Sequence, residues 1–188
     1  MTELAPIFEK IDYTFTFQNY EFSSGIQELD NFFYNDSKTF IKYGYSQMYV
    51  LRESDKTNII GYFTLSSSTI QWDESLSIEK LTRYIPGVLL RMFAIDKRFR
   101  RKKYGSDLIK KAVYIALEIS KDRGCRSIYV DSLIDPETIK FYFNMGFNFV
   151  DKPLGKLIVN KLSSKEKIDR NTIKMYFELF KIKNPNRS

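Results

Sequence analysis

The chain has 188 residues, a net charge of +7, 43% hydrophobic residues, a single cysteine and no histidine. Its length and hydrophobic content predict one packed domain over residues 1–188, and its charge favours acidic partners such as phosphates, a coenzyme or RNA. The lack of histidine excludes Ser-His and Cys-His nucleophile pairs and most zinc sites. With one cysteine, no visible signal segment and no apolar run near the roughly 18 residues of a membrane span, we expect a cytoplasmic protein without membrane contact.

Apolar periodicity predicts the elements that begin the chain. Residues 11–20 alternate apolar and polar side chains, which indicates a half-buried strand. Ser24 precedes Gln27 by three residues, the spacing of a capping box. The helix that this box would begin carries apolar residues at helical spacing and is expected to end near Gly44.

Two strands and an insertion are predicted next. Residues 49–52 and 59–68 have strand composition, and the polar segment 54–58 between them predicts a hairpin turn. We expect residues 72–87 to form an irregular insertion, with a short helix around residues 76–81 and an end at Pro86-Gly87.

Residues 88–95 form a nearly continuous apolar run, which indicates a strand buried on both faces near the middle of a sheet. Five basic residues follow: Arg98, Arg100, Arg101, Lys102 and Lys103. A long amphipathic helix then begins at Tyr104-Gly105-Ser106. A strand end, a basic turn and a helix N-terminus together predict an anion site, with solvated charges as the alternative interpretation.

The second half of the chain alternates helices and strands. We expect the long helix to end at Arg123, with Gly124 as its C′ residue. The remaining predictions are a strand at 127–133, a short helix capped by Asp135 and ending at 145–146, a strand at 147–150 broken by Pro153, a helix or loop at 157–168, a strand at 173–180 and a frayed tail at 181–188. This order predicts an α/β (α+β) layer around a mixed sheet.

Two motifs resemble the GNAT N-acetyltransferases. The run from Arg100 to Gly105 is similar to their acyl-CoA signature (R/Q)-x-x-G-x-(G/A), with Lys103 in place of the first glycine. The run from Phe141 to Phe147 is similar to their later FY-x-x-x-GF motif. The resemblance implies a GNAT-like, mostly antiparallel sheet of six to seven strands flanked by helices, acetyl-CoA as co-substrate and no metal.

A narrower resemblance points to the GNAT toxins of toxin–antitoxin pairs. Residues 22–33 look like the opening F-x-x-G-x-x-x-L-x-x-F of those toxins, residues 83–96 like their R-Y-x-P…L-x-R-L-A-V-D segment, and residues 175–179 like their closing strand. Those toxins acetylate the amino group of aminoacyl-tRNA. The resemblance therefore implies an aminoacyl-tRNA acceptor and an antitoxin partner, and it leaves a homodimer open.

The resemblance assigns the co-substrate residues by motif position. The strand segment Phe93, Ala94 and Ile95 would bind the pantetheine arm through its main chain. The pyrophosphate would be held by Arg100, Arg101, Lys102, Lys103, Tyr104, Gly105 and Ser106.

Tyr142 matches the tyrosine that in many family members protonates the departing CoA thiolate, although packing is an alternative role for it. No base stands out, and an α-amine, whose pKa is about 8, needs none as strong as lysine does. The candidate bases are Glu53, Asp73, Glu74 and Asp131. Arg91, inside the apolar strand, is interpreted as a paired structural or acceptor-channel residue, and Cys125 as packing.

Two alternatives to aminoacyl-tRNA acetylation stay open. One is an acetyltransferase for a small-molecule or protein amine. The other is a CoA-binding scaffold without turnover, which the lysine at position 103 keeps in consideration. A plain RNA-binding protein, indifferent to CoA, is a third class that the charge alone would allow.

Overall fold

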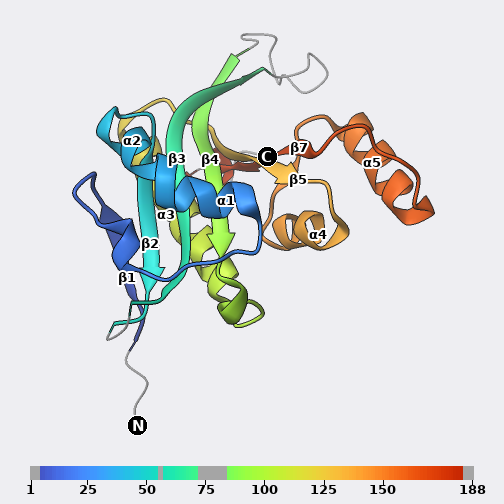
Figure 1. Cartoon of the computed structure of the whole chain (residues 1–188). Coiled ribbons are helices and arrows are strands. Elements are labelled where there is room, and N and C mark those ends of the chain that lie inside the picture. The colour runs from blue at the N-terminus through green and yellow to red at the C-terminus, as the bar shows by residue number, and fades with distance from the viewer. Residues whose placement is uncertain (1–4, 55–56, 72–83, 184–188) are drawn as a thin grey trace. The chain divides into compact units, whose positions relative to one another are not determined.

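The computed structural model describes residues 5–54, 57–71 and 84–183, and it contains a seven-stranded mixed sheet (Figure 1). The strand order is β1-β2-β3-β4-β5-β7-β6. The strands are β1 (Ile7–Ile11), β2 (Gln47–Arg52), β3 (Ile59–Gln71), β4 (Tyr84–Ile95), β5 (Ser127–Leu133), β6 (Asn148–Phe149) and β7 (Thr172–Glu178). The predicted fold class is confirmed.

Helices join these strands. In chain order they are η1 (Phe17–Asn19), α1 (Gln27–Asn31), the π-helical turn η2 (Phe32–Asp36), α2 (Ser37–Lys42), η4 (Lys97–Phe99), α3 (Tyr104–Asp122), α4 (Pro136–Asn144), α5 (Lys152–Ser164) and α6 (Leu179–Lys183). Within the described ranges, none of them combines the length and the apolar composition that crossing a bilayer requires.

The chain forms two compact units, residues 1–66 with 90–112, and residues 67–89 with 113–188. The single domain over residues 1–188 stays a prediction.

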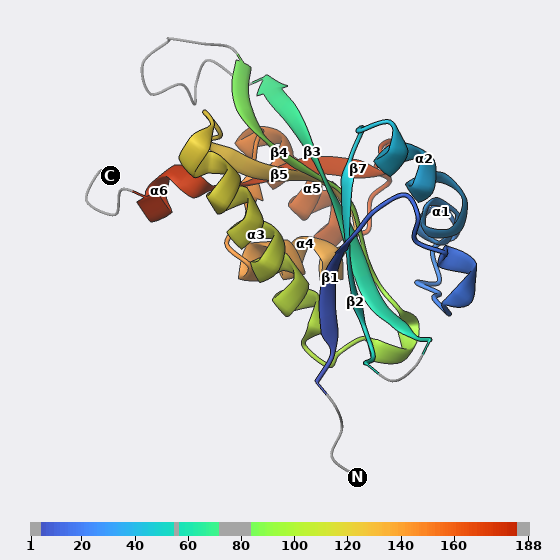
Figure 2. The same cartoon turned by 90° about the vertical axis from the view of Figure 1, so that its left-hand side faces the viewer.

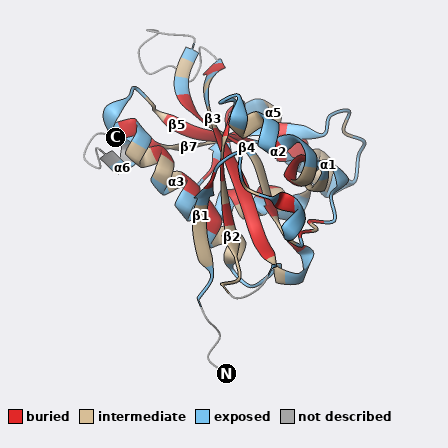
Figure 3. Ribbon diagram, turned by 60° about the vertical axis from the view of Figure 1, so that its left-hand side comes forward, coloured by how far each residue is buried: buried red, intermediate tan, exposed pale blue. Residues whose placement is uncertain are grey.

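In the first unit, β1, β2 and β3 pair antiparallel, and helices cover one face of them. Met48, Val50 and Tyr62 point to this face and pack with Phe32 and Phe33 of η2. Tyr62 donates a hydrogen bond to the Leu29 carbonyl at 2.8 Å, so even its polar end is satisfied inside the core. Figure 3 shows how fully the first part of β3 is buried.

The beginning of α3 covers the opposite face of the same strands (Figure 2). Gly61 of β3 is a point of close approach, because a Cβ there would overlap the side chains of Ile95 in β4 and Leu108 in α3. Near the edge of the sheet, the Lys111 ammonium lies 5.3 Å from the centre of the Phe8 ring. The small residue at position 61 therefore sets the distance between helix and sheet.

The strand predicted at residues 11–20 is wrong. β1 ends at Ile11, because Asp12 Oδ1 accepts hydrogen bonds from the amide and hydroxyl of Thr14, at 2.8 and 2.5 Å, and turns the chain. Phe15 and Phe17 then enter the core from this turn and from η1. Their alternation reflects aromatic packing in a compact segment, which periodicity alone cannot distinguish from a strand.

The helix predicted after Ser24 is confirmed, but its capping box is wrong. The helical run begins at Gln27 with Ile26 as an N-cap that has no side-chain bond. Ser24 instead donates to Asp30 through both its amide and its hydroxyl, at 2.7 and 2.5 Å. The run ends before Gly44, whose φ of +72° suits glycine.

In the second unit, β7 lies between β5 and β6 and pairs antiparallel with both. Asp135 caps α4 by accepting hydrogen bonds from the amides of Glu137 and Thr138, as predicted. The ambiguous segment at residues 157–168 is helical as far as Ser164. Its helix α5 begins at Lys152 with Asp151 as N-cap, so Pro153 starts a helix where we expected it only to break a strand.

Three further predictions are corrected. Pro86-Gly87 does not end an insertion but lies inside β4, where a Cβ on Gly87 would overlap the Ser127 carbonyl and the Tyr129 ring. Gly124 follows α3 without the positive φ that a C′ glycine adopts. Residues 181–183 belong to α6 rather than to a frayed tail. The short helix at 76–81, Asp73, Glu74 and residues 184–188 lie outside the described residues.

Candidate functional site

The turn between β4 and α3 contains the predicted anion site, and it begins with a buried carboxylate. Asp96 is 0% exposed and follows β4 directly. Its Oδ1 accepts from the amide and the Nε of Arg98, at 2.8 and 3.0 Å, and its Oδ2 accepts from Nη2 at 2.9 Å. Burial alone would raise the pKa of Asp96, but the bonds and the charge of Arg98, with the Ser23 amide, outweigh it and lower that pKa.

This network separates Arg98 from the other four basic residues of the turn, which are the ones predicted to hold the pyrophosphate. Arg98 Nη1 also donates to Glu21 Oε2 and to Asn58 Oδ1, both at 3.0 Å. Its guanidinium is therefore committed to holding the turn, and its pKa is raised by the hydrogen bonds that it donates to Asp96 and Glu21. Spacing along the sequence could not separate this structural arginine from its neighbours.

Arg100 provides a second tether, since its Nη2 donates to the Ser24 carbonyl. The three residues after it, Arg101, Lys102 and Lys103, are exposed. The Lys102 ammonium lies 5.3 Å from the centre of the Phe99 ring, which keeps this side chain close to the turn. All five basic residues of the turn are thus exposed, and two of them, Arg98 and Arg100, also fix its base.

The backbone of the turn takes up an unusual conformation at two residues. Arg101 has a φ of +61° and Lys103 a φ of +68°. Both lie in the left-handed region that glycine adopts at little cost. Lys103 stands where the acyl-CoA signature has glycine, so the chain keeps the glycine conformation with a lysine side chain.

The N-terminus of α3 completes this half of the site. Its first helical hydrogen bond runs from the Asp107 amide to the Lys103 carbonyl at 3.1 Å. The amides of Tyr104, Gly105 and Ser106 consequently have no partner inside the helix. Free amides and the positive end of a helix dipole bind anions, which is the property predicted for this turn.

The segment Phe93, Ala94 and Ile95 forms the end of β4. Ala94 is buried, whereas Phe93 and Ile95 are half-buried. The amide of the following Asp96 donates to the Ile60 carbonyl at 2.9 Å, which ties this end of β4 to β3. All ten predicted co-substrate residues therefore lie in the first unit, along one continuous strand, turn and helix.

Tyr142 lies in the second unit, on α4, and is 4% exposed. Its ring makes edge contacts with Phe141 and Phe147, at centroid distances of 5.3 and 5.4 Å. Burial raises the pKa of its phenol well above the ordinary value. This tyrosine is therefore held in its protonated form.

The FY-x-x-x-GF motif has a structural explanation. Gly146 has a φ of +86°, and a Cβ there would lie 3.0 Å from the Phe177 ring. This turn lets the Phe147 amide donate to the Tyr142 carbonyl at 3.0 Å. The motif glycine and phenylalanine thus fix the last turn of the helix that carries Tyr142.

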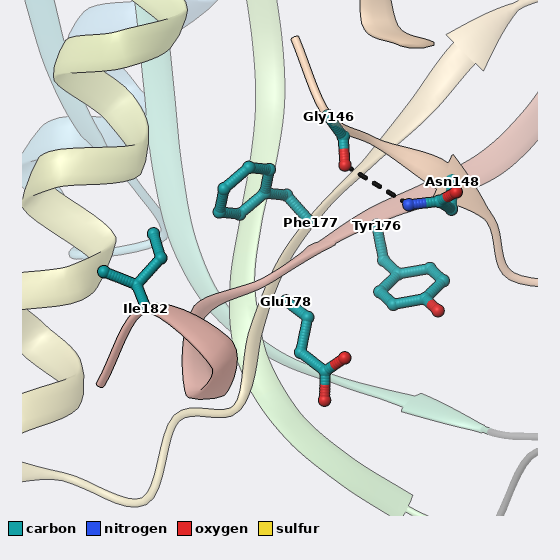
Figure 4. A pocket seen from close by; sticks show the side chains of 6 residues that line it. All are labelled: Gly146, Asn148, Tyr176, Phe177, Glu178 and Ile182. Carbon is teal, nitrogen blue, oxygen red and sulfur yellow. Dashed lines mark hydrogen bonds between the residues drawn. The ribbon is translucent and has the colours of Figure 1, made fainter. Parts of the chain in front are cut away.

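A hollow beside this motif was not predicted from the sequence. It has a volume of about 260 Å³ and is lined by Gly146, Asn148, Tyr176, Phe177, Glu178 and Ile182 (Figure 4). Asn148 donates to the Gly146 carbonyl at 3.3 Å across its rim. Glu178 forms an ion pair with Arg126 at 2.9 Å, so its charge is compensated.

The candidate bases within the described residues both have partners. Asp131 pairs with Lys174 at 2.7 Å, and Glu53 accepts a hydrogen bond from Asn58 at 2.6 Å. Of the other residues of interest, Arg91 is exposed with its guanidinium 5.0 Å from the centre of the Phe40 ring. The Cys125 thiol lies 3.7 Å from the Ser127 carbonyl.

Comparison with known families decides what this arrangement is. A family model described as an acetyltransferase (GNAT) domain matches residues 44–149. The chain belongs to the GNAT acetyltransferases. The match includes the β4–α3 turn and Tyr142, so both motifs that suggested the GNAT family lie inside the matched region.

Similar proteins include GNAT toxins. The probable toxin TacT of Sinorhizobium fredii (strain NBRC 101917 / NGR234) is 28% identical over 117 residues, which cover 60% of this chain and 65% of that relative. Among solved structures, a tyrosine-to-phenylalanine variant of KacT has a TM-score of 0.76 at 20% identity, covering 97% of this chain and 99% of that one. AtaTR bound with acetyl-CoA has a TM-score of 0.72 at 20% identity, covering 95% and 96%. At these identities the structural likeness establishes the fold.

Proposed function

We propose that this GNAT protein transfers the acetyl group of acetyl-CoA to the α-amino group of aminoacyl-tRNA. The observation that carries the proposal is the β4–α3 turn, which combines exposed basic residues with amides that have no partner inside helix α3, in a GNAT domain. Acetyl-CoA has the pyrophosphate that such a turn accommodates. The AtaTR structure with acetyl-CoA supports this choice of co-substrate.

The residues of the first unit fit this co-substrate. The main chain of Phe93 and Ile95, at the end of β4, would bind the pantetheine arm. Arg101, Lys102 and Lys103 would supply charge to the phosphates, and the amides of Tyr104, Gly105 and Ser106 would donate hydrogen bonds. Arg100 would act from the base of the turn, where its bond to the Ser24 carbonyl holds it.

The reaction follows from the protonation states. The neutral amine of the acceptor attacks the thioester carbonyl carbon, a C–N bond forms, and the C–S bond breaks as the tetrahedral intermediate collapses. We assign Tyr142 as the acid that gives its proton to the departing thiolate, because burial keeps its phenol protonated. The attacking nitrogen loses its proton to solvent, and solvent returns a proton to the Tyr142 phenolate.

The acceptor is chosen on the chemistry of the amine. An α-amine with a pKa of about 8 is about half neutral near pH 8, so the reaction needs no strong base. This fits the described candidate bases, each of which is engaged by a lysine or an amide. The likeness to AtaT, solved in complex with acetyl-methionyl-tRNAfMet, supports a tRNA acceptor.

A toxin of this kind needs an inhibitor. The structure of AtaT bound to the C-terminus of the antitoxin AtaR supports a proteinaceous antitoxin for this chain as well. We place the protein in the cytoplasm, where acetyl-CoA and charged tRNA occur together. The homodimer stays a prediction.

The test is label transfer from radiolabelled acetyl-CoA to three separate acceptor pools: charged tRNA, polyamines and peptides. Wild type is compared with Tyr142→Phe and with Tyr114→Phe, a matched change at an exposed tyrosine. We expect label on charged tRNA, lost with Tyr142→Phe and retained with Tyr114→Phe. Label confined to polyamines or peptides would retain an acetyltransferase and reject the tRNA acceptor.

A further inference from the structure

The chain turns from the end of α2 into β2 in the first unit (Figure 1). An exposed group of aromatic rings lies at this turn. Tyr43 and Tyr45 flank Gly44 and are 65% and 64% exposed. Their ring centres are 6.4 Å apart, and Tyr45 makes an edge contact with the half-buried Phe40 at 5.7 Å. Single exposed aromatic side chains are common on protein surfaces. Here two exposed rings lie next to each other and one of them contacts a third, which forms a continuous aromatic surface typical of a binding site.

Cations are positioned on the same rings. Arg91 Cζ lies 5.0 Å from the centre of the Phe40 ring, and Lys42 Nζ lies 5.6 Å from that of Tyr43. Both distances are within the range of a cation–π contact. Residues 37–47 contain two lysines and no acidic residue, so every charged side chain in this segment is positive. Arg91 is a charged residue in an otherwise apolar strand, and its contact with the Phe40 ring makes it part of this surface.

We infer that this patch, made of Phe40, Lys42, Tyr43, Tyr45 and Arg91, is a stacking platform for the single-stranded 3′ end of a tRNA. The inference rests on the proposed function and names which part of the acceptor this surface binds. Proteins that bind single strands combine aromatic faces for the bases with cations for the backbone, and both are present together. A polycationic amine would be repelled by the same cations, and an apolar partner would not need them.

The geometry fits stacking on the outer faces of the rings. Gly44, at a φ of +72°, makes the tight turn that places two tyrosines on either side of it. The inner part of the turn is fixed, since the amides of Tyr45 and Ser46 both donate to the Phe40 carbonyl, at 2.9 and 3.3 Å. The rings are therefore held by a rigid backbone while most of their surface stays open to a base.

The test uses a fluorescein-labelled single-stranded RNA that ends in CCA, with binding followed by fluorescence anisotropy. Tyr43→Ala and Tyr45→Ala should each weaken binding about tenfold. Tyr43→Phe and Tyr45→Phe should bind like wild type, because a phenyl ring stacks as well. Tyr13→Ala is the matched control, since Tyr13 is 51% exposed in the same unit but outside the patch. Thermal melting of every variant establishes that it is folded.

Two further readouts separate the possible outcomes. In a plot of log K for RNA binding against log salt concentration, Arg91→Ala should reduce the magnitude of the slope by about 0.7, because it removes one phosphate contact. In acetyl transfer, the alanine variants should raise KM for aminoacyl-tRNA about tenfold and leave KM for acetyl-CoA unchanged. Unchanged RNA binding by the alanine variants, or equal losses in the phenylalanine variants, would overturn the inference, as would a loss confined to antitoxin binding.

Failure of the proposed function has a different signature. If wild type acetylates no aminoacyl-tRNA and yet binds the RNA in a ring-dependent way, the proposed acceptor is wrong and the stacking platform stands. If wild type acetylates aminoacyl-tRNA with a KM that the alanine substitutions do not change, the acceptor is right and the platform is rejected.

Discussion

The carboxylate of Asp96 accepts a hydrogen bond from the Ser23 amide at 2.9 Å, although the two residues are 73 positions apart in the chain. The Lys97 amide returns a bond to the Ser23 carbonyl at 2.9 Å. The segment that precedes α1 is thereby joined to the start of the β4–α3 turn. A change at either residue should alter the position of the turn that we assign to the co-substrate.

Asp96→Asn should lower the free energy of unfolding by about 2 kcal/mol, because one of two accepting oxygens becomes a donor that faces the donors of Arg98 and Ser23. The turn should also shift, which we expect to raise KM for acetyl-CoA about tenfold. Urea unfolding and initial rates measure the two effects. Glu21→Gln is the control: Glu21 contacts Arg98 from an exposed position, so its loss should leave both quantities nearly unchanged.

The same carboxylate predicts the acid sensitivity of the fold. Because the pKa of folded Asp96 is lowered, its contribution to stability is present above its unfolded pKa of about 3.9 and is lost as the pH falls through the folded value. Wild type should therefore lose stability relative to Asp96→Asn below about pH 4. A constant difference between the two proteins from neutral to strongly acidic pH would contradict this assignment.

Lys103→Gly should show that a glycine conformation is being held by a lysine. At a φ of +68°, glycine relieves backbone strain. Glycine at Lys102, which has no positive φ, adds freedom to the unfolded chain and removes the exposed contact with the Phe99 ring. Each substitution removes one positive charge from the same turn. We expect Lys103→Gly to be more stable than Lys102→Gly by about 1 kcal/mol in urea unfolding. Equal stabilities would mean that the left-handed backbone at position 103 carries no strain.

Gly155→Ala should destabilise the second unit although alanine is the better helix former. A Cβ at Gly155 would overlap the ring of Phe149, so α5 or β6 must shift. Such overpacking costs about 1–3 kcal/mol, more than the gain of up to 1 kcal/mol from helix propensity. Gly124→Ala is the matched control, because a Cβ there meets nothing within 4 Å. The melting temperature of Gly155→Ala should be lower than that of Gly124→Ala. The reverse order would mean that the Phe149 ring moves aside at little cost.

The outcome for individual elements shows which parts of the fold could be predicted from the sequence. The long periodic helix α3 and the cap at Asp135 depend on neighbours along the chain, and their predictions are confirmed. The strand at residues 11–20 was not, since the Asp12 turn competes locally with an aromatic alternation that mimics a strand. Pro86 was misplaced because its strand position depends on a partner, the Arg126 amide, far along the chain.

The residues of the candidate site also fall into a group that the sequence could predict and a group that it could not. The exposed cations and the helix start were predictable, because a strand, a basic turn and a helix are contiguous in sequence. The structural roles of Arg98 and Ser24 were not, because each is defined by a contact with a distant segment. Resemblance to the GNAT motifs is what points to Tyr142 as the proposed acid, since composition cannot separate it from 12 other tyrosines in a chain that has 13.

Tyr142→Phe should reduce the single-turnover rate about 100-fold or more while leaving the melting temperature close to that of wild type, since the ring contacts with Phe141 and Phe147 remain. The rate of wild type should rise with pH as the amine loses its proton, and should then stay level to about pH 10, because the raised pKa keeps Tyr142 protonated. A 3′-amide analogue of aminoacyl-tRNA avoids ester hydrolysis. A fall in rate near pH 8 that only wild type shows would reject Tyr142 as the acid.

The most direct measurement locates the acetyl group on the product. Charged tRNA is incubated with acetyl-CoA and the protein, digested with ribonuclease, and the terminal aminoacyl-adenosine is examined by mass spectrometry. We predict N-acetyl-aminoacyl-adenosine from wild type and a sharply reduced amount from Tyr142→Phe. An acetyl group on a nucleobase, or an unmodified tRNA while another amine in the same reaction is acetylated, would contradict the proposed function.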